Sequence, residues 1–407
     1  MNKKVLYISY NGLLESILPS QVTPYLKILS KDGYKFVLLT FEKKKDLEKY
    51  TPGELKRIGD ELKNYGITWK WLVYHKYPDK ISTFFDVITG FFVSLYLAAR
   101  HRFGIIHVRG VTPGVIALFL PRILGFKFIF DTRGLLAEEY VGGGLWKEAG
   151  VFFNLVKAAE KKLFSKTDAV VVLTEKHRSS IADTGYFKDK NISISVIPCC
   201  VDMERFGDYS DIRKKDALKK YGITADMLFI YPGKLGTFYL IKEMMDFFEC
   251  ASGKNQNLKF LILTQDDIEV LNKKKISIDS QKAYFIHPLY EEIPVLLNCA
   301  DAGIFFINPY KKFGSSPIKL GEFLACGKPV IINSGIGDTE ELVRDNRVGV
   351  VIKDFNKNEY MDKIKELFEL LQEGKTLAGR CRAVARKYLS LEMGADSYRR
   401  IYSELTK

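Results

Sequence analysis

The feature that most constrains this chain is an alternation of short apolar runs with helix-like segments, which occurs once in each half of the sequence. In the first half, such runs are VLYISY (5–10), FVLLTF (36–41), IIHVRG (105–110), FKFIFD (126–131) and AVVVLT (169–174). Segments with helical character lie between them, at 20–34, 112–125 and about 147–165. Short buried strands that alternate with helices are typical of a parallel sheet covered by helices on both faces.

The second half restarts the same pattern. Its predicted strands are 227–236 with its glycine turn, 258–264, 284–290 with its loop, 302–308, 328–333 and 349–352, with helices from about 239, at 293–300 and at 318–327. The interruption falls in SVIPCCVDMERF (195–206), at Pro198. A chain of 407 residues also exceeds the ~250–300 that one core usually serves. We therefore predict two α/β domains, 1–195 and 196–389, and an amphipathic helix, 390–407, that crosses back to the first domain.

The positive charge is concentrated in the first half. Residues 1–200 hold 30 Lys and Arg against 19 Asp and Glu, a net charge of +11, whereas the whole chain carries +13. Such asymmetry indicates an anionic partner, either a membrane surface or a nucleic acid. The sequence has no nucleic-acid-binding motif, so we expect no nucleic acid.

One apolar segment, STFFDVITGFFVSLYLAARHR (82–102), has two interpretations. It is either a helix that docks on anionic lipid or a helix buried in the first domain, and the apolar residues that nearly encircle it favour burial. Its longest apolar run, Val87 to Ala99, is too short to span a bilayer. The N-terminus lacks the pattern of a signal peptide. We expect a cytoplasmic protein, soluble or peripheral on the inner face of the cell membrane.

The six cysteines form no CxxC pair and no cluster with metal-ligand spacing. They are expected to be free thiols in a reducing compartment. We expect neither a metal site nor a cofactor.

Candidate site residues fall at the carboxyl ends of predicted strands, where open parallel sheets bind ligands. Gly233, Lys234 and Gly236 follow the first strand of the second domain. Glycines allow a diphosphate to approach the backbone, and the lysine supplies the opposite charge. A tight turn with a solvated lysine is the alternative.

A second candidate segment is FGSSPIKLGEFLACGKPVI (313–331). Ser315 and Ser316 precede Pro317, which is suited to begin a helix whose N-terminus favours anions. Lys319 and Glu322 share a face of that helix, and a carboxylate there can accept hydrogen bonds from ribose hydroxyls. Helix capping with a surface ion pair is the alternative.

Taken together, these segments resemble the GT4 family of retaining glycosyltransferases, which have the GT-B fold. The resemblance includes the turn at 233–236, the linker IPCCVD, and SSPIKLGEFLACGKPVI followed by GIGDTEEL. In the first half it includes 20–34, IIHVRG, FIFDTRG (128–134) and AVVVLTE (169–175). The family implies a nucleotide-diphosphate sugar bound mainly by the C-terminal domain, an acceptor bound by the N-terminal domain, retention at the anomeric carbon, no metal, and an active site in the cleft between the two domains.

The resemblance assigns roles to the second-domain residues. Glu322 matches the ribose-binding glutamate of the family's E-x7-E signature, and Gly314 stands in place of the first glutamate. Lys234 matches the arginine of the phosphate motif, and Tyr239 stands where a lysine is expected. Lys319 is predicted to compensate, so that Glu322 and Lys234 hold opposite ends of the nucleotide while Lys234 and Lys319 stabilise the departing diphosphate.

In the first domain, His107 and Arg109 match the family's HxH, with arginine in place of the second histidine, and both are predicted to be catalytic. Arg133 and Gln21 are predicted to bind the acceptor, with a structural ion pair as the alternative for Arg109 and Arg133. The resulting hypothesis is sugar transfer to a polysaccharide or lipid-linked glycan. A sugar-nucleotide epimerase and a non-catalytic partner subunit of the same fold are the alternatives.

Overall fold

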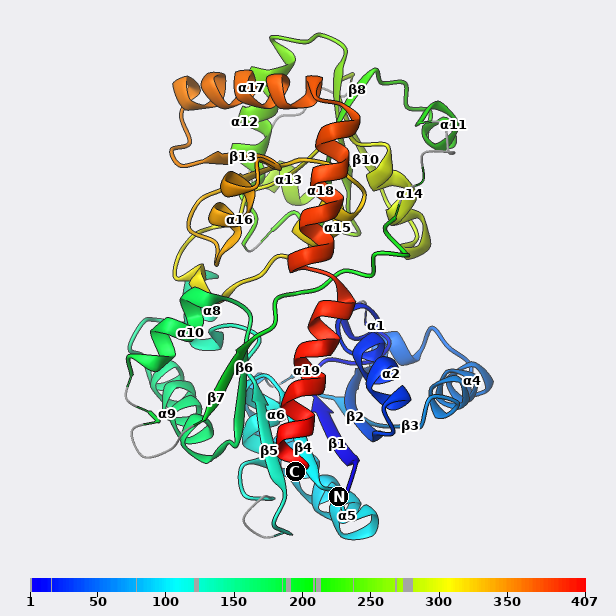
Figure 1. Ribbon diagram of the computed structural model, residues 1–407, viewed down its shortest axis with the longest axis vertical. Coiled ribbons are helices and arrows are strands. Elements are labelled where there is room, and N and C mark those ends of the chain that lie inside the picture. Colours follow the sequence, from blue (N-terminus) through cyan, green and yellow to red (C-terminus); the bar gives the residue numbers. More distant parts are fainter. Residues whose placement is uncertain are drawn as a thin grey trace. The chain divides into compact units, whose positions relative to one another are not determined.

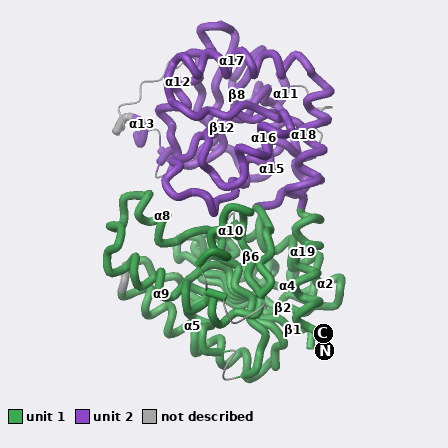
Figure 2. The backbone as a smooth tube through the Cα atoms, turned by 60° about the vertical axis from the view of Figure 1, so that its left-hand side comes forward, with its two compact units in different colours: residues 1–198, 391–407 green, residues 199–390 purple. Residues whose placement is uncertain are grey.

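In the computed structural model, the two alternating series form two parallel sheets, each in its own unit (Figure 2). Unit 1 comprises Met1–Pro198 and Leu391–Lys407, and unit 2 comprises Cys199–Ser390. The structure describes residues 2–407 except 16, 78, 121–123, 185, 188–191, 208, 210–213, 237, 268 and 274–280.

The sheet of unit 1 has seven strands in the order β3-β2-β1-β4-β5-β6-β7, and each neighbouring pair is parallel. Its strands are β1 (Lys4–Ser9), β2 (Lys35–Lys43), β3 (Ile67–Tyr74), β4 (Ile105–Arg109), β5 (Lys127–Asp131), β6 (Ala169–Val172) and β7 (Ser193–Val196). Its helices are α1 (Ile17–Gln21), α2 (Thr23–Lys31), α3 (Lys44–Leu47), α4 (Pro52–Lys63), α5 (Asp79–His101), α6 (Val111–Ala117), α8 (Leu136–Gly142), α9 (Val151–Lys166), α10 (Glu175–Ala182) and α19 (Leu391–Leu405).

The central strands of unit 1 are buried on both faces, as expected of a parallel sheet. On one face, alternate residues such as Leu6, Val108 and Phe130 join a core that includes residues of α5, α6 and α9. On the other face, His107 contacts two tyrosines of the C-terminal helix α19, which lies beside β1, β4 and β5 (Figure 1). The C-terminal helix therefore completes the second covering layer of the first sheet.

The sheet of unit 2 has six strands in the order β10-β9-β8-β11-β12-β13, again all parallel. Its strands are β8 (Met227–Pro232), β9 (Leu258–Leu263), β10 (Ala283–Ile286), β11 (Ala302–Phe305), β12 (Val330–Asn333) and β13 (Gly349–Ile352). Its α-helices are α11 (Lys214–Lys219), α12 (Ile241–Ser252), α13 (Glu269–Lys273), α14 (Ile293–Asn298), α15 (Ile318–Ala325), α16 (Thr339–Asp345), α17 (Lys357–Gln372) and α18 (Lys375–Tyr388), with 3-10 turns η1 (Tyr290–Glu292) and η2 (Lys312–Gly314).

Both sheets thus reverse their direction of growth at one internal point. In unit 1 the reversal lies between β1 and β4, and in unit 2 it lies between β8 and β11. Ligands of open parallel sheets bind outside the carboxyl ends of the strands at such a point. The predicted fold class, two Rossmann-like parallel-sheet domains, is confirmed, and the topology places a candidate ligand position in each unit.

Some elements differ from the sequence predictions. β3 was not predicted, because its burial alternates along an edge strand and its sequence, ITWKWLVY, mixes charged and aromatic residues. β7 was not predicted either, because three of its four residues are only partly buried and the fourth is exposed. The predicted helix 112–125 is shorter, since α6 ends at Ala117, and residues 121–123 of that prediction lie outside the described residues.

The apolar segment 82–102 forms most of α5, and it combines features of both interpretations. Ser82, Asp86 and Ser94 are buried, whereas Phe84 and Phe92 are 67% and 63% exposed. The apolar stretch is also longer than predicted, because Ile81–His101 is long and apolar enough to cross a membrane by length and composition. The helix is therefore attached to the domain by small and polar residues together with Leu97 and Phe91, whereas Phe84 and Phe92 are left exposed.

The cysteines agree with the sequence analysis. All six are free, and five of them are buried. Burial raises the pKa of the Cys326 and Cys381 thiols, which therefore stay protonated near neutral pH.

Candidate active site

The turn that follows β8 brings the backbone of Gly233 against a lysine from another part of unit 2. A Cβ atom on Gly233 would lie 2.9 Å from Cε of Lys319 and 2.9 Å from the hydroxyl oxygen of Tyr231. Only glycine leaves room for both groups. In the same turn, the backbone N–H of Leu235 donates to the carboxylate of Asp266 at 2.7 Å. The turn thus leaves space for Lys319 and Tyr231 at Gly233, and the hydrogen bond to Asp266 fixes it at Leu235.

Lys319, on α15, is held over this turn by aromatic side chains. Its Nζ donates to the hydroxyl of Tyr239 at 2.7 Å and lies 4.2 Å from the centroid of that ring. It also lies 5.8 Å from the centroid of Tyr231. Tyr239 thus orients the lysine instead of supplying a second cation, and the structure brings the predicted residues Gly233 and Lys319 together.

Lys234 and Gly236 complete the turn, and both lie in more open surroundings than Gly233. The side chain of Lys234 is exposed, and no described residue forms an ion pair with it. A Cβ atom on Gly236 would meet no atom within 4 Å. Lys234 therefore offers a mobile, hydrated charge, whereas Lys319 offers one that is already fixed.

Glu322 lies one turn further along α15 and is partly buried. Burial raises the pKa of its carboxyl group to about 7, although the cations Lys319 and Arg205 act in the opposite direction. No described residue donates a hydrogen bond to this carboxylate. A desolvated carboxyl group without a donor is suited to receive the hydroxyl groups of a ligand.

The start of α15 agrees with the predicted boundary, and its serines have structural partners. Pro317 is the N-cap residue, directly before Ile318. The hydroxyl oxygen of Ser316 accepts a hydrogen bond from the backbone N–H of Cys199 at 3.1 Å, and the N–H of Ser315 donates to the carbonyl of Lys312 at 3.0 Å. The predicted donor contacts of Ser315, Ser316 and Pro317 stay predictions, and Ser316 also fastens the first residue of unit 2.

Two cations near the site were missed by the sequence analysis. Lys312 is 7% exposed, and its Nζ lies 4.1 Å from the centroid of Phe238, which follows the glycine turn. Arg205 stacks on Tyr290 at 3.7 Å and is close enough to Glu322 to influence its pKa. Lys312 stands beside Gly314 in the sequence and could have been noticed there, whereas the linker around Arg205 gives no such signal.

In unit 1, the strand register brings polar and charged residues together at the topological reversal. We call this set, which includes His107 and Arg133, the ionic row. Ser9, Arg109 and Asp131 are neighbours at the carboxyl ends of β1, β4 and β5. One pleat earlier, Tyr7 lies beside His107, with ring centroids 4.4 Å apart. The predicted residues His107 and Arg109 are thus adjacent on one sheet face and aligned with a buried aspartate.

The helix α19 covers this row and supplies part of its hydrogen bonding. Nδ1 of His107 lies 2.7 Å from the hydroxyl of Tyr402, and the hydroxyl of Tyr398 donates to Asp131 at 2.8 Å. Arg133 donates to the same Asp131 oxygen at 2.6 Å, and its own φ of +55° folds the chain back to allow this. The guanidinium of Arg109 is 9% exposed, and its Nη1 has no hydrogen-bond partner among the described residues.

The electrostatics of this row follow from its burial. Burial disfavours the ionised form of Asp131, but Arg133, His107 and Arg109 overcome this effect and hold the pKa of that carboxyl below its usual range. Burial lowers the pKa of His107, and it raises the pKa of Tyr7 to about 12. At neutral pH the row therefore contains one carboxylate, two guanidinium groups and a neutral imidazole, a net positive charge.

Two of the predicted residues of unit 1, His107 and Gln21, are almost completely buried. His107 is 1% exposed, so its predicted role in catalysis stays a prediction. Gln21, the last residue of α1, is 2% exposed. The predicted cleft between the domains, and the acceptor contacts of Arg133 and Gln21, also stay predictions. No group of three or more His, Cys, Asp or Glu side chains in the described part of the chain is arranged to hold a metal ion.

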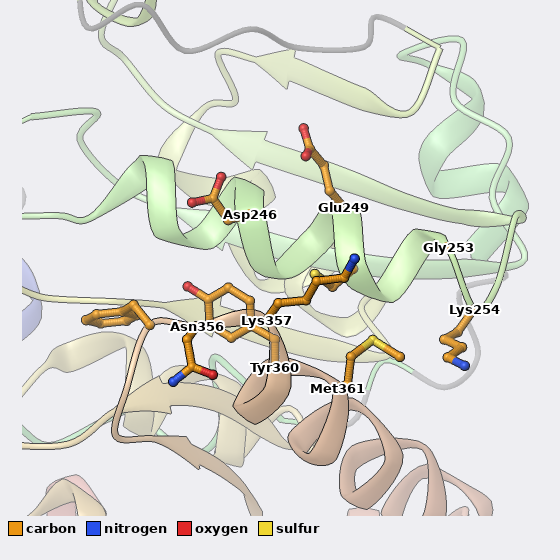
Figure 3. A pocket seen from close by; sticks show the side chains of 10 residues that line it. Asp246, Glu249, Gly253, Lys254, Asn356, Lys357, Tyr360 and Met361 are labelled. Carbon is orange, nitrogen blue, oxygen red and sulfur yellow. The ribbon is translucent and has the colours of Figure 1, made fainter.

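Unit 2 also has an open groove of about 630 Å³ between α12 and α17, with a lining that includes Asp246, Glu249, Lys357 and Tyr360 (Figure 3). None of the predicted donor-binding residues lines it. We therefore place the candidate donor site at the turn after β8 and not in this groove.

One family model matches a large part of unit 2. Residues 229–369, which contain the turn after β8 and the whole of α15, match the family model of glycosyl transferases group 1. No curated protein matches the sequence closely enough to be counted as a relative.

Solved structures of similar fold cover almost the whole chain. A sucrose-phosphate synthase from Thermosynechococcus elongatus is 15% identical and has a TM-score of 0.76, with 99% of each chain covered. A glycosyltransferase from Rickettsia africae is 16% identical, with a TM-score of 0.69 and 99% and 98% of the two chains covered. HepE from Anabaena, in complex with UDP and glucose, is 13% identical, with a TM-score of 0.69 and 99% and 100% covered. At these identities the likeness shows the fold alone: the chain has the GT-B fold of these structures, and residues 229–369 are similar to glycosyl transferases group 1.

Proposed function

We propose that the protein transfers a sugar from a nucleoside-diphosphate sugar to a polysaccharide or lipid-linked glycan, with retention at the anomeric carbon. The observation that carries this proposal is the position of Lys319 directly over the Gly233 backbone, with the unpartnered carboxyl group of Glu322 one helical turn away. A cation over an open glycine turn suits a diphosphate, and a desolvated carboxyl group suits a ribose diol.

The chemistry asked of unit 2 is electrostatic. As the bond between the sugar and the diphosphate breaks, negative charge grows on the departing diphosphate, and a cation fixed in advance stabilises it without reorganisation. Lys319 is fixed by Tyr239, whereas Lys234 is free to move with the leaving group. Glu322 accepts hydrogen bonds from the ribose in its ionised form, so donor binding draws its pKa down from about 7.

The choice of a nucleotide donor is supported by a protein of the same fold. HepE, of which 100% is covered in the comparison, was crystallised with UDP and glucose. We infer the same class of donor for this chain because its cation and carboxyl group lie at the family-matched turn and helix. The sugar and the base are left to experiment.

For the acceptor, we propose that the net positive row of unit 1 attracts an anionic group. Arg109 has a guanidinium nitrogen without a partner among the described residues. Arg133 pairs with Asp131, which is the neighbour of Arg109 across the sheet. A phosphate or carboxylate on a glycan or lipid carrier is the chemical group that two guanidinium ions recognise. We propose a cytoplasmic location, where nucleotide sugars are made.

The test is to incubate the full chain with a panel of nucleotide sugars and to measure released nucleoside diphosphate, first without and then with a lipid-linked glycan acceptor. Slow release that the acceptor accelerates supports transfer, and proton NMR of the product reports the anomeric configuration. Conversion of the donor without diphosphate release would instead indicate an epimerase. Binding of the donor with no conversion of any kind would indicate a non-catalytic partner subunit.

A further inference from the structure

The helix α5 leaves many of its large apolar residues exposed. Its buried face contains Leu97 and a row of small and polar residues at intervals of about four positions: Ser82, Asp86, Gly90, Ser94 and Ala98. Residues spaced in this way lie above one another on one side of a helix. Helices of globular proteins normally bury their largest apolar residues, so the packing of α5 leaves those residues elsewhere.

The contacts on the buried face hold α5 firmly against unit 1. A Cβ atom on Gly90 would lie 2.9 Å from Cδ1 of Ile116 and 3.0 Å from Cζ of Phe41, so the helix approaches the domain as closely as its backbone allows. Asp86 accepts a hydrogen bond from the hydroxyl of Tyr10 at 2.8 Å and pairs with Nδ1 of His75 at 2.6 Å. With this face fixed, α5 cannot cross a bilayer as an isolated helix.

The opposite face of α5 is an exposed apolar stripe. We call it the aromatic stripe of α5, and it consists of Ile81, Phe84, Phe85, Ile88, Phe92 and Tyr96. The rings of Phe84, Phe92 and Tyr96 are each more than 60% exposed. At 1.5 Å per residue the stripe runs along ~22 Å of helix. An exposed apolar surface that is this continuous marks an interaction site.

The charges around the stripe identify its partner. Apart from buried Asp86, residues 81–102 contain no acidic side chain. At the C-terminal end, Arg100 and Arg102 are exposed, and the pKa of His101 is lowered first by burial and then by Arg100, Lys4 and Lys70. At the other end, Lys76 is exposed and lies over the ring of Tyr77 at 5.1 Å. Cations thus flank both ends of an aromatic and aliphatic stripe.

We propose that the aromatic stripe of α5 lies in the interface of an anionic lipid bilayer, parallel to its surface. Phenylalanine and isoleucine side chains enter the acyl boundary, and lysine and arginine extend to anionic headgroups. A second copy of this chain fits less well, because it would present the same cations. The stripe belongs to unit 1 and the turn at Gly233 to unit 2, so vesicle binding and sugar transfer can fail independently.

The experiment measures co-sedimentation of the full chain with vesicles of phosphatidylcholine and phosphatidylglycerol, mixed roughly 2:1, and with vesicles of phosphatidylcholine alone. The wild type is expected to bind the anionic vesicles at low salt and to dissociate as salt is raised. The variant Phe84→Ser/Phe92→Ser should bind at least ~10-fold more weakly. The matched control Leu289→Ser, which removes an apolar side chain that is 66% exposed in unit 2, should bind as the wild type does.

Two further variants separate the contributions of charge and apolar contact. Arg100→Gln/Arg102→Gln should lose binding to anionic vesicles and retain the melting temperature, since both side chains are exposed. Phe92→Trp preserves the apolar face, and its fluorescence should shift to the blue when anionic vesicles are added, a readout that does not depend on a destabilising change.

Three results would overturn the proposal. They are absence of wild-type binding at low salt, binding of Phe84→Ser/Phe92→Ser equal to that of the wild type, and light scattering that shows a dimer dissociated by the same pair of substitutions. The last result would assign the stripe to contact between copies of the chain. Diphosphate release without lipid should be the same in all these variants, so a failure of the proposed donor chemistry would be recognised separately.

Discussion

The two units have sheets of the same order, but they treat the reversal point differently. In unit 1, the strand ends at the reversal are covered by the chain's own helix α19, whose Tyr398 donates to Asp131 and whose Tyr402 lies against His107. In unit 2, the corresponding position at the turn after β8 is left with a fixed cation, an open backbone and the unpartnered carboxyl group of Glu322. Shared topology therefore provides two equivalent places, one covered by a helix of the chain itself and one left open for the donor.

This difference separates two kinds of contribution that charged residues make. A buried ionic row that the chain itself satisfies contributes mainly to the integrity of the domain, because removal of one member leaves another charge uncompensated. A partly solvated site with unmet hydrogen-bonding capacity costs stability in the empty protein and recovers it on binding. Removal of Asp131 in unit 1 should therefore act mainly on folding, and substitutions of Lys319 and Glu322 in unit 2 mainly on binding and turnover.

The largest expected effect is that of Asp131→Asn. The substitution leaves Arg133 and Arg109 without their buried carboxylate, so unfolding free energy should fall by roughly 3–5 kcal/mol. Urea denaturation followed by tryptophan fluorescence reports on this unit, because all three tryptophans, at 69, 71 and 146, lie in it. Because the folded-state pKa of Asp131 is depressed, its contribution is present above its ordinary pKa and is lost as the pH falls toward the lowered value.

The matched control is Asp301→Asn in unit 2. Asp301 pairs with Lys214 at 2.6 Å but is 35% exposed, so its loss should cost far less, measured by the melting temperature of the full chain. If the two substitutions proved equally mild, the row in unit 1 would not be the structural element described above.

The next largest effect is expected from Lys319→Met. It removes the cation that Tyr239 holds over the glycine turn, so single-turnover sugar transfer should slow by ~10²–10³-fold, as for a lost oxyanion donor. Lys234→Met should slow it far less, because the exposed Lys234 is hydrated before and after reaction. The reverse ranking would show that the mobile lysine stabilises the leaving group.

A third substitution, Glu322→Gln, should stabilise the empty protein and weaken nucleotide binding. The folded-state pKa is raised to about 7 from 4.5, so wild-type stability declines as the pH rises from 4.5 and levels above 7. Gln removes that decline, and at pH 8 the variant should be ~1–3 kcal/mol more stable. Calorimetry in the absence of ligand measures this difference.

Nucleoside-diphosphate affinity supplies the second half of that test. In the wild type it should weaken below pH 7, as Glu322 becomes protonated, and in Glu322→Gln the part of the pH dependence due to this group should vanish. The ionisation of the nucleotide itself is common to both proteins. Unchanged affinity in the folded variant would refute the ribose contact and the family alignment at α15.

The smallest expected effect is that of Tyr402→Phe. Loss of its hydroxyl leaves Nδ1 of His107 without this partner, which should cost about 1 kcal/mol of stability in unit 1. Tyr360→Phe, whose hydroxyl donates at 3.4 Å to the carbonyl of Glu243 in unit 2, is the control and should be nearly neutral. A change in turnover without a change in stability would instead indicate that His107 reaches the reacting groups.

The sequence was sufficient to predict the fold and the segments that carry the candidate site, but not the contacts between those segments. Strand–helix alternation is a local pattern, and it predicted both sheets and the start of α15 at Pro317. It could not show that Lys319 lies against Gly233, because that contact joins residues far apart in the sequence. Nor could it show that His107 is covered by Tyr402, which comes from the opposite end of the chain. For α5, composition alone suggested burial, because the depth of each face depends on what the rest of the domain packs against Gly90.

The assignment of α19 to unit 1 has a consequence for how the protein is made. Residues 391–407 follow the whole of unit 2 in synthesis, yet they cover Tyr7, His107 and Asp131, which are translated early. At ~5–20 residues per second, the first sheet waits at least about ten seconds on the ribosome for its last helix, with its ionic row uncovered. Nascent chains arrested before residue 391 should therefore display unit 1 in a protease-sensitive form, and release of the final helix should be the event that makes it resistant.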